Sequence, residues 1–316
     1  MRAARSARQQ AVAQGRPLTP DDLQHGARAQ NAAGLERLAR RVRPSVGWAD
    51  LVLPGDVVGQ LRELASRARL RDVVLDGWGM GRASSLRGRG LTALFAGDSG
   101  TGKTMSAEVM AGELGLDLYV IDLSTVIDKY VGETEKHLDR IFGEADRVNG
   151  VLLFDEADAV FGKRSDVRDS HDRYANVEVA YLLQRMEQFD GVAILTTNLR
   201  SNLDEAFTRR LDAVIDFPVP DEGDRLRLWD RHLPAGVPRD ADVDLGFLAR
   251  SFRLSGGNVR NVCLAAAYLA AADDRPLRMA DLIHGTAREY QKLGRLCVEA
   301  EFGRYHRLVA GQVAFG

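Results

Sequence analysis

A glycine-rich stretch at residues 91–104, LTALFAGDSGTGKT, limits the possible folds of this chain more than any other feature. Its apolar first half predicts a buried strand over residues 91–96, and a helix is predicted to begin near Lys103. The loop between them fits the pattern G-x-x-x-x-G-K-[ST]. The fixed positions are held by Gly97, Gly102, Lys103 and Thr104. A strand, a glycine loop and a helix in this order predict a nucleotide-binding α/β fold.

Each residue type in this loop has a physical role in holding a polyphosphate. Glycines let the backbone turn tightly, so that consecutive N–H groups point inward, and the helix start adds its positive dipole end. The ammonium of Lys103 can reach the β- and γ-phosphates, and the Thr104 hydroxyl can ligate Mg²⁺. The residues expected to bind the nucleotide are Gly97, Asp98, Ser99, Gly100, Thr101, Gly102, Lys103 and Thr104.

Strands and helices alternate after the loop. Further strands are expected at 116–123, 151–157, 192–198 and 213–220, with helices at 103–114, 133–148 and 175–189 between them. This alternation predicts a five-stranded parallel sheet with helices on both faces and ligands at the carboxyl ends of the strands. The pattern then becomes wholly helical, at 222–233, 242–252, 257–273 and 279–293. We expect a basic helical arm or the remnant of an upstream region over 1–45, an α/β domain over 46–220, a small helical lid over 221–294 and a tail over 295–316.

Composition excludes several classes of protein. The 43 Lys and Arg residues balance 45 Asp and Glu residues, so the whole molecule is not an electrostatic nucleic-acid binder. Residues 1–43 are nevertheless basic, with nine arginines against three acids, and a helix is expected over about 21–41. Cys263 and Cys297 have no metal or redox spacing and are read as reduced thiols in packed helices. No apolar run is long enough for a membrane span, and the start lacks a signal-peptide core.

Polar residues at the ends of two predicted strands suggest the reaction at this site. Asp155 and Glu156 follow the apolar residues 151–154, 52 residues after Lys103. There Asp155 could hold Mg²⁺ beside Thr104, and Glu156 could polarise an attacking water. An acidic helix cap is the alternative reading of these two acids. Asn198 ends the next strand and could orient water against a γ-phosphate, although a turn-forming Asn explains it nearly as well.

With these residues assembled, residues 48–293 resemble the AAA+ ATPases. Gly97 to Thr104 resembles their Walker A loop, Asp155 and Glu156 their Walker B pair, and Asn198 their sensor 1. Arg209 and Arg210, in DEAFTRRLD, match the position of arginine fingers. The resemblance implies Mg²⁺-dependent ATP hydrolysis in a ring, most commonly a hexamer, in which the fingers reach the neighbouring subunit's γ-phosphate. A helix end that favours cations is the alternative for the arginine pair.

The resemblance to this family implies two further sets of residues that contact the nucleotide. Gly257 and Arg260 fit the G-x-x-R form of sensor 2, although many protein-remodelling members lack this arginine, and a solvent-facing helix residue is the alternative. The segment WADLVLP, read as strand-like, resembles the one whose backbone holds adenine, which implicates Leu51 and Val52.

The segment KYVGETE at residues 129–135 resembles pore loop 1 of the protein-remodelling subgroup. Tyr130, Val131 and Gly132 would line the channel of a ring and grip extended polypeptide by apolar contact. The alternative is that Tyr130 and Val131 are core residues entering a helix. Residues 165–172 would form a second pore-facing loop.

At a finer level, three phrases resemble the AAA+ ATPases encoded with bacterial extracellular contractile injection systems, which are phage-tail-like particles. The phrases are DRYANVEVAYLLQRMEQFDG, LSGGNVRNVCLAAAYLAA and REYQKLGRL. Those relatives carry a longer N-terminal region, so the substrate stays open. The resemblance implies a homo-oligomeric cytoplasmic bacterial ATPase that remodels a particle component or cargo. Two alternatives remain: a nucleic-acid translocase that uses the basic arm, and a nucleotide-switched scaffold with little turnover.

Overall fold

The computed structural model describes residues 34–83, 89–126, 133–148, 150–158, 170–198 and 208–310, with the side chains of 82–83 and 170–177 excepted. Contacts divide the chain into two units. The sheet unit comprises Met1–Leu51, Asp56–Gly97 and Lys103–Asp216. The helical unit comprises Val52–Gly55, Asp98–Gly102 and Phe217–Gly316.

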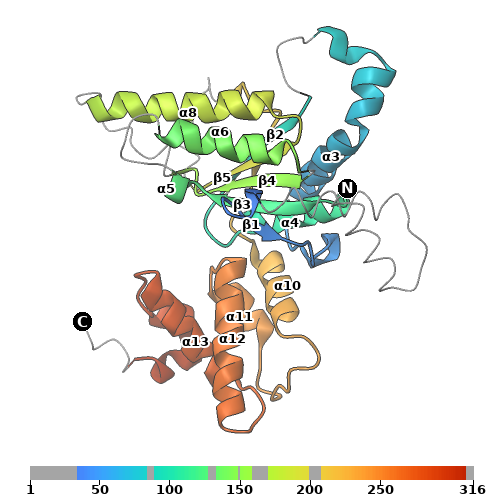
Figure 1. Cartoon of the computed structure of the whole chain (residues 1–316). Helices are drawn as coiled ribbons and strands as arrows, with labels where there is room; N and C mark the ends of the chain where they lie inside the picture. Colours follow the sequence, from blue (N-terminus) through green and yellow to red (C-terminus); the bar gives the residue numbers. More distant parts are fainter. Residues whose placement is uncertain are drawn as a thin grey trace, which may run out of the picture. The chain divides into compact units, whose positions relative to one another are not determined.

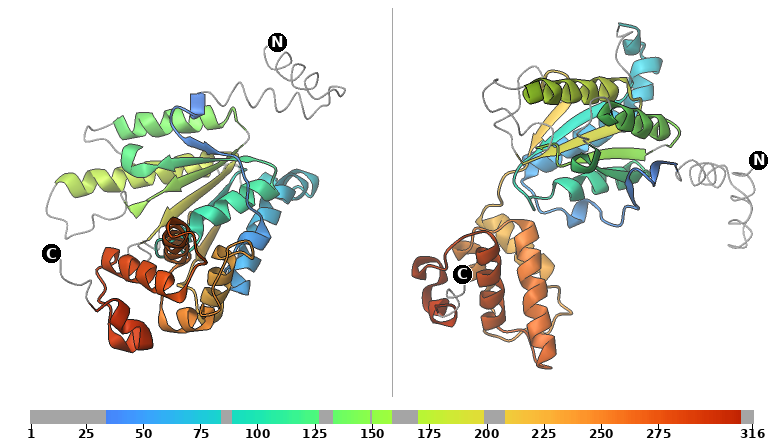
Figure 2. Two further views of the ribbon diagram at one scale, coloured as in Figure 1. Left: turned by 90° about the horizontal axis from the view of Figure 1, so that it is seen from below. Right: turned by 60° about the vertical axis from the view of Figure 1, so that its left-hand side comes forward.

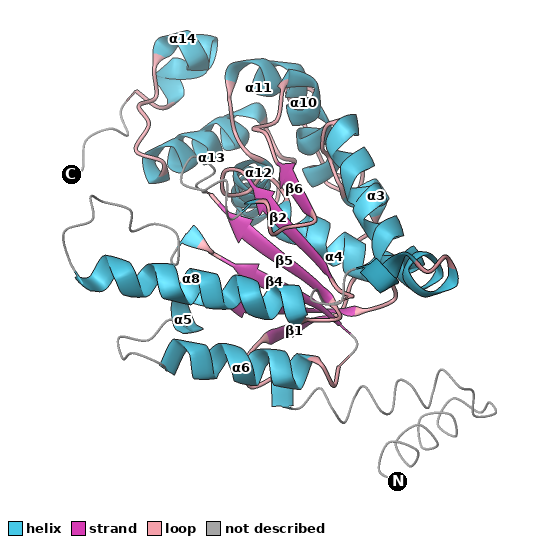
Figure 3. Cartoon of the chain, turned by 90° about the horizontal axis from the view of Figure 1, so that it is seen from above, coloured by secondary structure: helices cyan, strands magenta, loops and turns pink. Residues whose placement is uncertain are grey.

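The sheet unit is built on six strands in the order β1-β3-β4-β5-β2-β6 (Figure 3). Five of them pair in parallel, as the alternating pattern predicts, and the edge strand β1 runs antiparallel to β3. The strands are β1 (Arg40–Val42), β2 (Leu91–Ala96), β3 (Asp117–Asp122), β4 (Gly150–Asp155), β5 (Val192–Thr197) and β6 (Ala213–Asp216).

Helices cover both faces of this sheet (Figures 1 and 3). Helices α6 (Glu133–Ala145) and α8 (Ser170–Gln188) pack on one face, where Phe142, Phe154 and Phe189 form an aromatic cluster. Helices α3 (Gly55–Asp72) and α4 (Lys103–Glu113) lie on the other face, and α4 contacts β3, β4 and β5. Strands β2, β4 and β5 read as continuous apolar runs because they are buried on both faces.

The structure differs from the expected N-terminal arm in the part that it describes. Residues 36–39 form turns instead of continuing a helix, and Arg40–Val42 then pair with β3 as a sixth strand. Leu35 is fully buried in the core beneath α6 and α8. The Arg41 guanidinium donates to Asp117, at 2.6 and 3.0 Å, and to Glu36 at 2.9 Å. Residues 34–42 therefore belong to the sheet unit, with Arg40–Val42 in the sheet itself, and residues 1–33 of the expected arm lie outside the described residues.

The segments between β1 and β2 are irregular. Residues Trp48–Asp50 form a short 3₁₀ helix, η1, so the expected strand in WADLVLP is wrong. Helix α3 continues into a π-helical turn, η2 (Val73–Gly77), and a 3₁₀ turn, η3 (Met80–Ala83), follows. Trp78 and Met80, at 72% and 64% exposed, make this connection an apolar surface.

The helical unit has a core of its own, in the orange and red segments of Figures 1 and 2. Its helices are α10 (Glu222–His232), α11 (Leu245–Ser251), α12 (Gly256–Ala272), α13 (Met279–Lys292) and α14 (Glu299–Phe302), with a 3₁₀ turn η5 (Gly303–Leu308). Edge-to-face contacts join Phe252, Tyr290 and Phe302. Since Phe302 and Val309 are fully buried there, residues 302–309 of the expected C-terminal tail are part of this core, and residues 311–316 lie outside the described residues. None of the helices in the described part of the chain has the length and apolar character needed to span a bilayer.

Candidate nucleotide-binding site

The glycine loop turns sharply between β2 and α4. Gly100 and Gly102 adopt φ values of +79° and +105°, a backbone region that side chains with a Cβ rarely enter. The Thr101 hydroxyl donates to the carbonyl oxygen of Asp98 at 2.8 Å and closes the loop on itself. The loop thus has the tight backbone that the motif requires.

Lys103 begins α4 and is only 8% exposed. Its ammonium donates to the carbonyl oxygen of Gly97 and to the side-chain oxygen of Asn198, the latter at 2.9 Å. A nearly buried cation needs such partners, because an unpaired charge away from water is costly. The contact joins the lysine predicted to bind phosphate to the asparagine predicted to orient water.

The two predicted acids lie at the end of β4 in different environments. Asp155 is half-buried, and its Oδ1 accepts hydrogen bonds from the Thr196 hydroxyl and, at 3.2 Å, from the backbone N–H of Glu156. Glu156 is exposed and adopts φ +58°, a left-handed backbone that is uncommon outside glycine. Among the described residues its carboxylate makes no hydrogen bond. The left-handed backbone therefore presents a carboxylate beside Asp155 that has no hydrogen-bond partner in the described part of the chain.

Strand order explains why these groups meet. Strand β5 lies between β4, which ends in Asp155, and β2, which leads into the loop. The backbone N–H of Gly97 donates to the carbonyl of Thr197 at 3.1 Å, and that of Ala157 donates to the carbonyl of Thr196 at 3.0 Å. Lys103, Asp155, Glu156 and Asn198 thus lie at one edge of the sheet, at the carboxyl ends of parallel strands.

Three polar residues at this edge were not predicted as site residues: Asp158, Thr196 and Thr197. Both threonines are 1% exposed, and each hydroxyl donates to a carboxylate, Thr196 to Asp155 and Thr197 to Asp158. The signal in the sequence is a Thr-Thr pair at the end of an apolar strand. Its partners could not be found in this way, because Asp155 ends a different strand, β4, and Asp158 lies three residues further on.

The arginine pair lies elsewhere in the sheet unit. Arg209 and Arg210 are exposed, in a turn just before β6. Because β6 runs parallel to β2, its first residue lies at the edge of the sheet opposite the glycine loop. The fold of one chain therefore does not bring these arginines to Lys103.

The sensor 2 residues lie at the start of α12. Within the helical unit, which includes Asp98–Gly102, the backbone N–H of Gly257 donates to the carbonyl of Gly100 at 3.1 Å. A Cβ on Gly257 would lie 3.2 Å from the Gly100 Cα, so a glycine suits this approach. Arg260 is exposed on the first turns of α12. Burial, together with the charges of Arg260 and Arg231, lowers the pKa of His232.

The remaining predicted residues are placed as follows. Leu51 is buried in the sheet unit, and Val52 packs against the core of the helical unit. The predicted pore residues Tyr130, Val131 and Gly132 lie outside the described residues, as do most of the residues 165–172.

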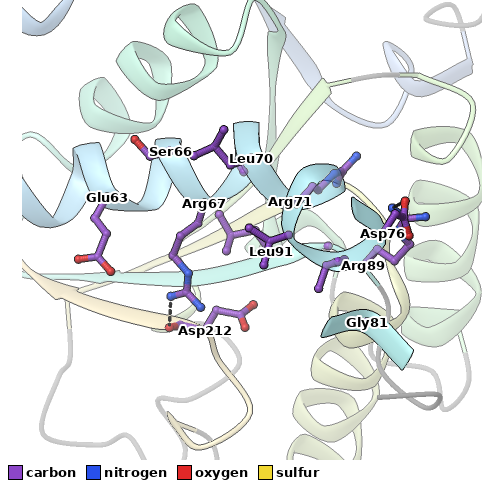
Figure 4. Close-up of a pocket in the computed structure, with 14 residues that line it drawn as sticks. Glu63, Ser66, Arg67, Leu70, Arg71, Asp76, Gly81, Arg89, Leu91 and Asp212 are labelled. Carbon is purple, nitrogen blue, oxygen red and sulfur yellow. Dashed lines mark hydrogen bonds and ion pairs between the residues drawn. The ribbon is translucent and has the colours of Figure 1, made fainter. Parts of the chain in front are cut away.

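A cleft of about 880 Å³ lies away from the glycine loop (Figure 4). Its walls come from α3, η2 and the amino end of β2, and Arg67, Arg71 and Arg89 point into it. Arg67 donates to the carbonyl of Asp212 at 3.3 Å, and Arg89 pairs with Asp76. Leu91, the first residue of β2, forms part of the lining. The cleft is therefore at the end of the sheet opposite the predicted phosphate-binding loop.

The donor set at the glycine-loop edge fits Mg²⁺. This ion prefers oxygen ligands and is usually held by one or two carboxylates, phosphate oxygens and water. Asp155 supplies a carboxylate whose Oδ1 is fixed by Thr196, and Thr104 supplies a hydroxyl one residue after Lys103. No cluster of three acidic, histidine or cysteine side chains is present among the described residues, so the remaining ligands would come from the nucleotide and water.

Comparison with known proteins agrees with this geometry. Residues 93–219 match the family described as ATPase family associated with various cellular activities (AAA). The chain is 32% identical over 216 residues to 26S proteasome regulatory subunit 10B of Dictyostelium discoideum, covering 66% of this chain and 53% of the relative. It is 31% identical over 247 residues to proteasome-activating nucleotidase 1 of Halobacterium salinarum, covering 75% of this chain and 59% of the relative. The chain thus spans about half the length of the curated relatives it matches.

The matched region begins within β2 and ends just after β6, so it contains the glycine loop, both acids, Asn198 and the arginine pair. Over residues 93–219 the chain is thus similar to the AAA family of ATPases.

Proposed function

We propose that this chain is a Mg²⁺-dependent ATPase that works as a ring of identical subunits and uses ATP hydrolysis to unfold or thread proteins. The observation that carries the proposal is the hydrogen bond between Lys103 and Asn198 at 2.9 Å, beside the two acids that end β4. This contact supports the proposal because the Lys103 ammonium and the Asn198 amide meet at the sheet edge where Asp155 and Glu156 also lie.

Each side chain has a role in the proposed hydrolysis. Lys103 binds the β- and γ-phosphates, and Thr104 and Asp155 hold Mg²⁺, which neutralises charge on the phosphates. Glu156 accepts the proton of the attacking water, and Asn198 orients that water. The turned backbone of residues 97–102 cradles the phosphates, and its tight φ angles are already formed.

A ring follows from the position of Arg209 and Arg210. Both are exposed at the sheet edge opposite Lys103, so they cannot act on their own chain's nucleotide without unfolding the sheet. On a neighbouring subunit they would supply positive charge at the γ-phosphate, which stabilises the transition state. We infer that each active site is shared by two subunits.

Protein is the proposed substrate because of the relatives and of one segment of the sequence. One matched relative is named as a proteasome-activating nucleotidase and another as a 26S proteasome regulatory subunit. The segment Tyr130–Gly132 carries an aromatic, an aliphatic and a glycine residue, a combination suited to gripping extended chain by apolar contact. We propose that this segment lines the channel of the ring.

The particular substrate that we propose is a component or cargo of a contractile injection particle. The support is the likeness of three sequence phrases, within residues 172–191, 254–271 and 288–296, to ATPases encoded with such particles. Two of the three phrases form α12 and the end of α13, in the helical unit.

The test measures ATP turnover per subunit against protein concentration, for the wild type, Glu156→Gln and Tyr130→Ala. A shared site predicts turnover that rises steeply with concentration, vanishes in Glu156→Gln and survives in Tyr130→Ala. A second assay follows loss of fluorescence from a folded fluorescent protein with an unstructured tail. There Tyr130→Ala should hydrolyse ATP without unfolding the substrate.

Other outcomes would replace the proposal. Turnover per subunit that is flat with concentration contradicts a shared site, and turnover near zero in an assembled ring indicates a nucleotide-switched scaffold. Tight binding of single-stranded DNA that weakens steeply with salt, together with DNA-stimulated turnover, indicates a nucleic-acid translocase.

A further inference from the structure

One carboxylate holds the end of β5. Asp158 lies three residues after the end of β4, and both of its oxygens accept from the backbone N–H of Asn198 at 3.0 Å. Its Oδ1 also accepts from the Thr197 hydroxyl, which is buried. These hydrogen bonds cross from the segment after β4 to the neighbouring strand, about 40 residues later in the chain.

The same strand end contacts the phosphate-binding loop. The carbonyl of Thr197 accepts from the Gly97 N–H at 3.1 Å, and the side-chain oxygen of Asn198 accepts from Lys103 at 2.9 Å. Asp158 binds the backbone N–H of the very residue whose side chain contacts Lys103. The carboxylate therefore fixes the peptide from which the Asn198 amide extends.

Loss of this carboxylate would free that peptide. Hydrogen bonds to an ionised acceptor are shorter and stronger than neutral ones, and here both donors belong to consecutive residues. Without Asp158 the Asn198 N–H has no hydrogen-bond partner among the described residues, and the Thr197 hydroxyl loses its bond to that carboxylate.

We propose that Asp158 is a positioning residue for ATP hydrolysis, acting through Asn198. The inference rests on the proposed function, in which Asn198 orients the attacking water. A helix-capping aspartate would bond to its own helix, whereas Asp158 bonds to β5. We therefore expect Asp158 to affect the rate of ATP hydrolysis by positioning the Asn198 side chain. This effect can be separated by experiment from a general effect on folding.

The test is a double-mutant cycle on steady-state ATP hydrolysis by the assembled protein, with Asp158→Ala, Asn198→Ala and the double variant. We expect Asp158→Ala to lower kcat by about tenfold or more, the loss typical of a charged hydrogen bond, without raising the KM for ATP. Because both changes remove the same positioned amide, the double variant should match Asn198→Ala within about twofold.

Two further variants separate positioning from folding. Asp158→Asn keeps one acceptor oxygen and should recover part of the lost kcat. Thr197→Val removes only the hydroxyl donor and should lower kcat less than Asp158→Ala does. If Asp158→Ala does not fold, the same cycle is run with Asp158→Asn, and thermal unfolding verifies each variant.

Asp122 provides a matched control at the end of the neighbouring strand β3. Its Oδ1 accepts from the backbone N–H of Ser124 at 2.9 Å and from the Ser124 hydroxyl at 2.6 Å, the same kinds of bond that Asp158 makes. Neither residue contacts Asn198 in the described structure. Asp122→Ala should leave kcat within about twofold of the wild type, as expected for an exposed side chain that makes no contact with Asn198, although Asp122 lies opposite Asp155 in the sheet.

The outcomes distinguish this inference from the proposed function. Suppose that the wild type hydrolyses ATP and that the kcat losses of Asp158→Ala and Asn198→Ala multiply in the double variant. The two residues then act independently, which overturns the role of Asp158 and leaves the proposed ATPase function standing. An unchanged kcat in Asp158→Ala, or an equal loss in Asp122→Ala, overturns it as well. Absence of turnover in the assembled wild type instead refutes the proposed function.

Discussion

Replacement of Glu156 by glutamine separates chemistry from stability in this site. Glutamine has nearly the same shape as glutamate but cannot accept a proton from water at neutral pH. The Glu156 carboxylate is exposed and makes no hydrogen bond among the described residues, so the change removes no contact of the fold. The left-handed backbone at φ +58° costs the same with either side chain.

The expected magnitudes follow from these facts. A positioned general base contributes about 10²- to 10⁴-fold to a rate, which is about 3–5 kcal/mol of activation free energy. The free energy of unfolding should change by no more than about 0.5 kcal/mol, as for other exposed side chains without partners. A large loss of kcat with an unchanged fold is therefore the predicted combination.

The assay combines steady-state turnover, binding of a fluorescent ATP analogue and urea unfolding of the same preparations. Analogue binding should stay within about threefold of the wild type, because Lys103 and the loop, not Glu156, hold the phosphates. A loss of kcat below about tenfold would refute the assignment of Glu156 as the base. A loss of stability above about 2 kcal/mol would show instead that the side chain has a structural partner.

Three more predictions follow from the contacts in the two units. Thr196→Val removes the hydroxyl that holds Asp155, and it should raise the Mg²⁺ concentration for half-maximal turnover about tenfold, measured by titration at saturating ATP. Leu35→Ala should lower the free energy of unfolding in urea by about 2–5 kcal/mol, because the side chain is fully buried. The control Leu70→Ala, at a residue 47% exposed, should change it by about 0.5 kcal/mol or less, and similar losses in the two variants would contradict the placement of Leu35 in the core. Burial raises the pKa of the Cys263 thiol to about 12, so a thiol reagent at pH 8 should label it only as fast as the protein unfolds; rapid labelling of the folded protein would refute this burial.

Local signals made the nucleotide loop predictable from the sequence. The glycines at 100 and 102 supply φ angles that other residues avoid, and the apolar strand before them and the helix after them are encoded in adjacent residues. The same holds for the buried strands β4 and β5, whose apolar runs allow few other readings.

Strand β1 could not be predicted in this way. Its residues, Arg40–Val42, are few and mostly polar, and the preceding Leu35 and Leu38 fit a helical period equally well. What makes them a strand is pairing with β3 and the contact of Arg41 with Asp117, 76 residues away. Tertiary contacts of this kind override a weak local preference.

The polar edge of the sheet shows the same limit at the site itself. Asp155, Glu156 and Asn198 were predicted because they follow apolar strands in a chain that also carries the glycine loop. Asp158 gives no such signal, since an acid shortly after a strand is ordinary in a loop. Its role arises from adjacency of β4 and β5, which only the folded sheet provides.

The order of strands also explains why a single strand end matters so much here. Strand β5 lies between the strand that leads to Lys103 and the strand that ends in Asp155, so its last residues contact both. A shift of Asn198 would alter its distance to the lysine, while a shift of Thr196 would alter the orientation of the aspartate. Pairing of β5 with β2 and β4 fixes the strand up to Thr197, and Asp158 extends that constraint by one residue, to Asn198. The geometry of the proposed active site therefore depends on the hydrogen bonds of Asn198, one residue beyond the regular sheet.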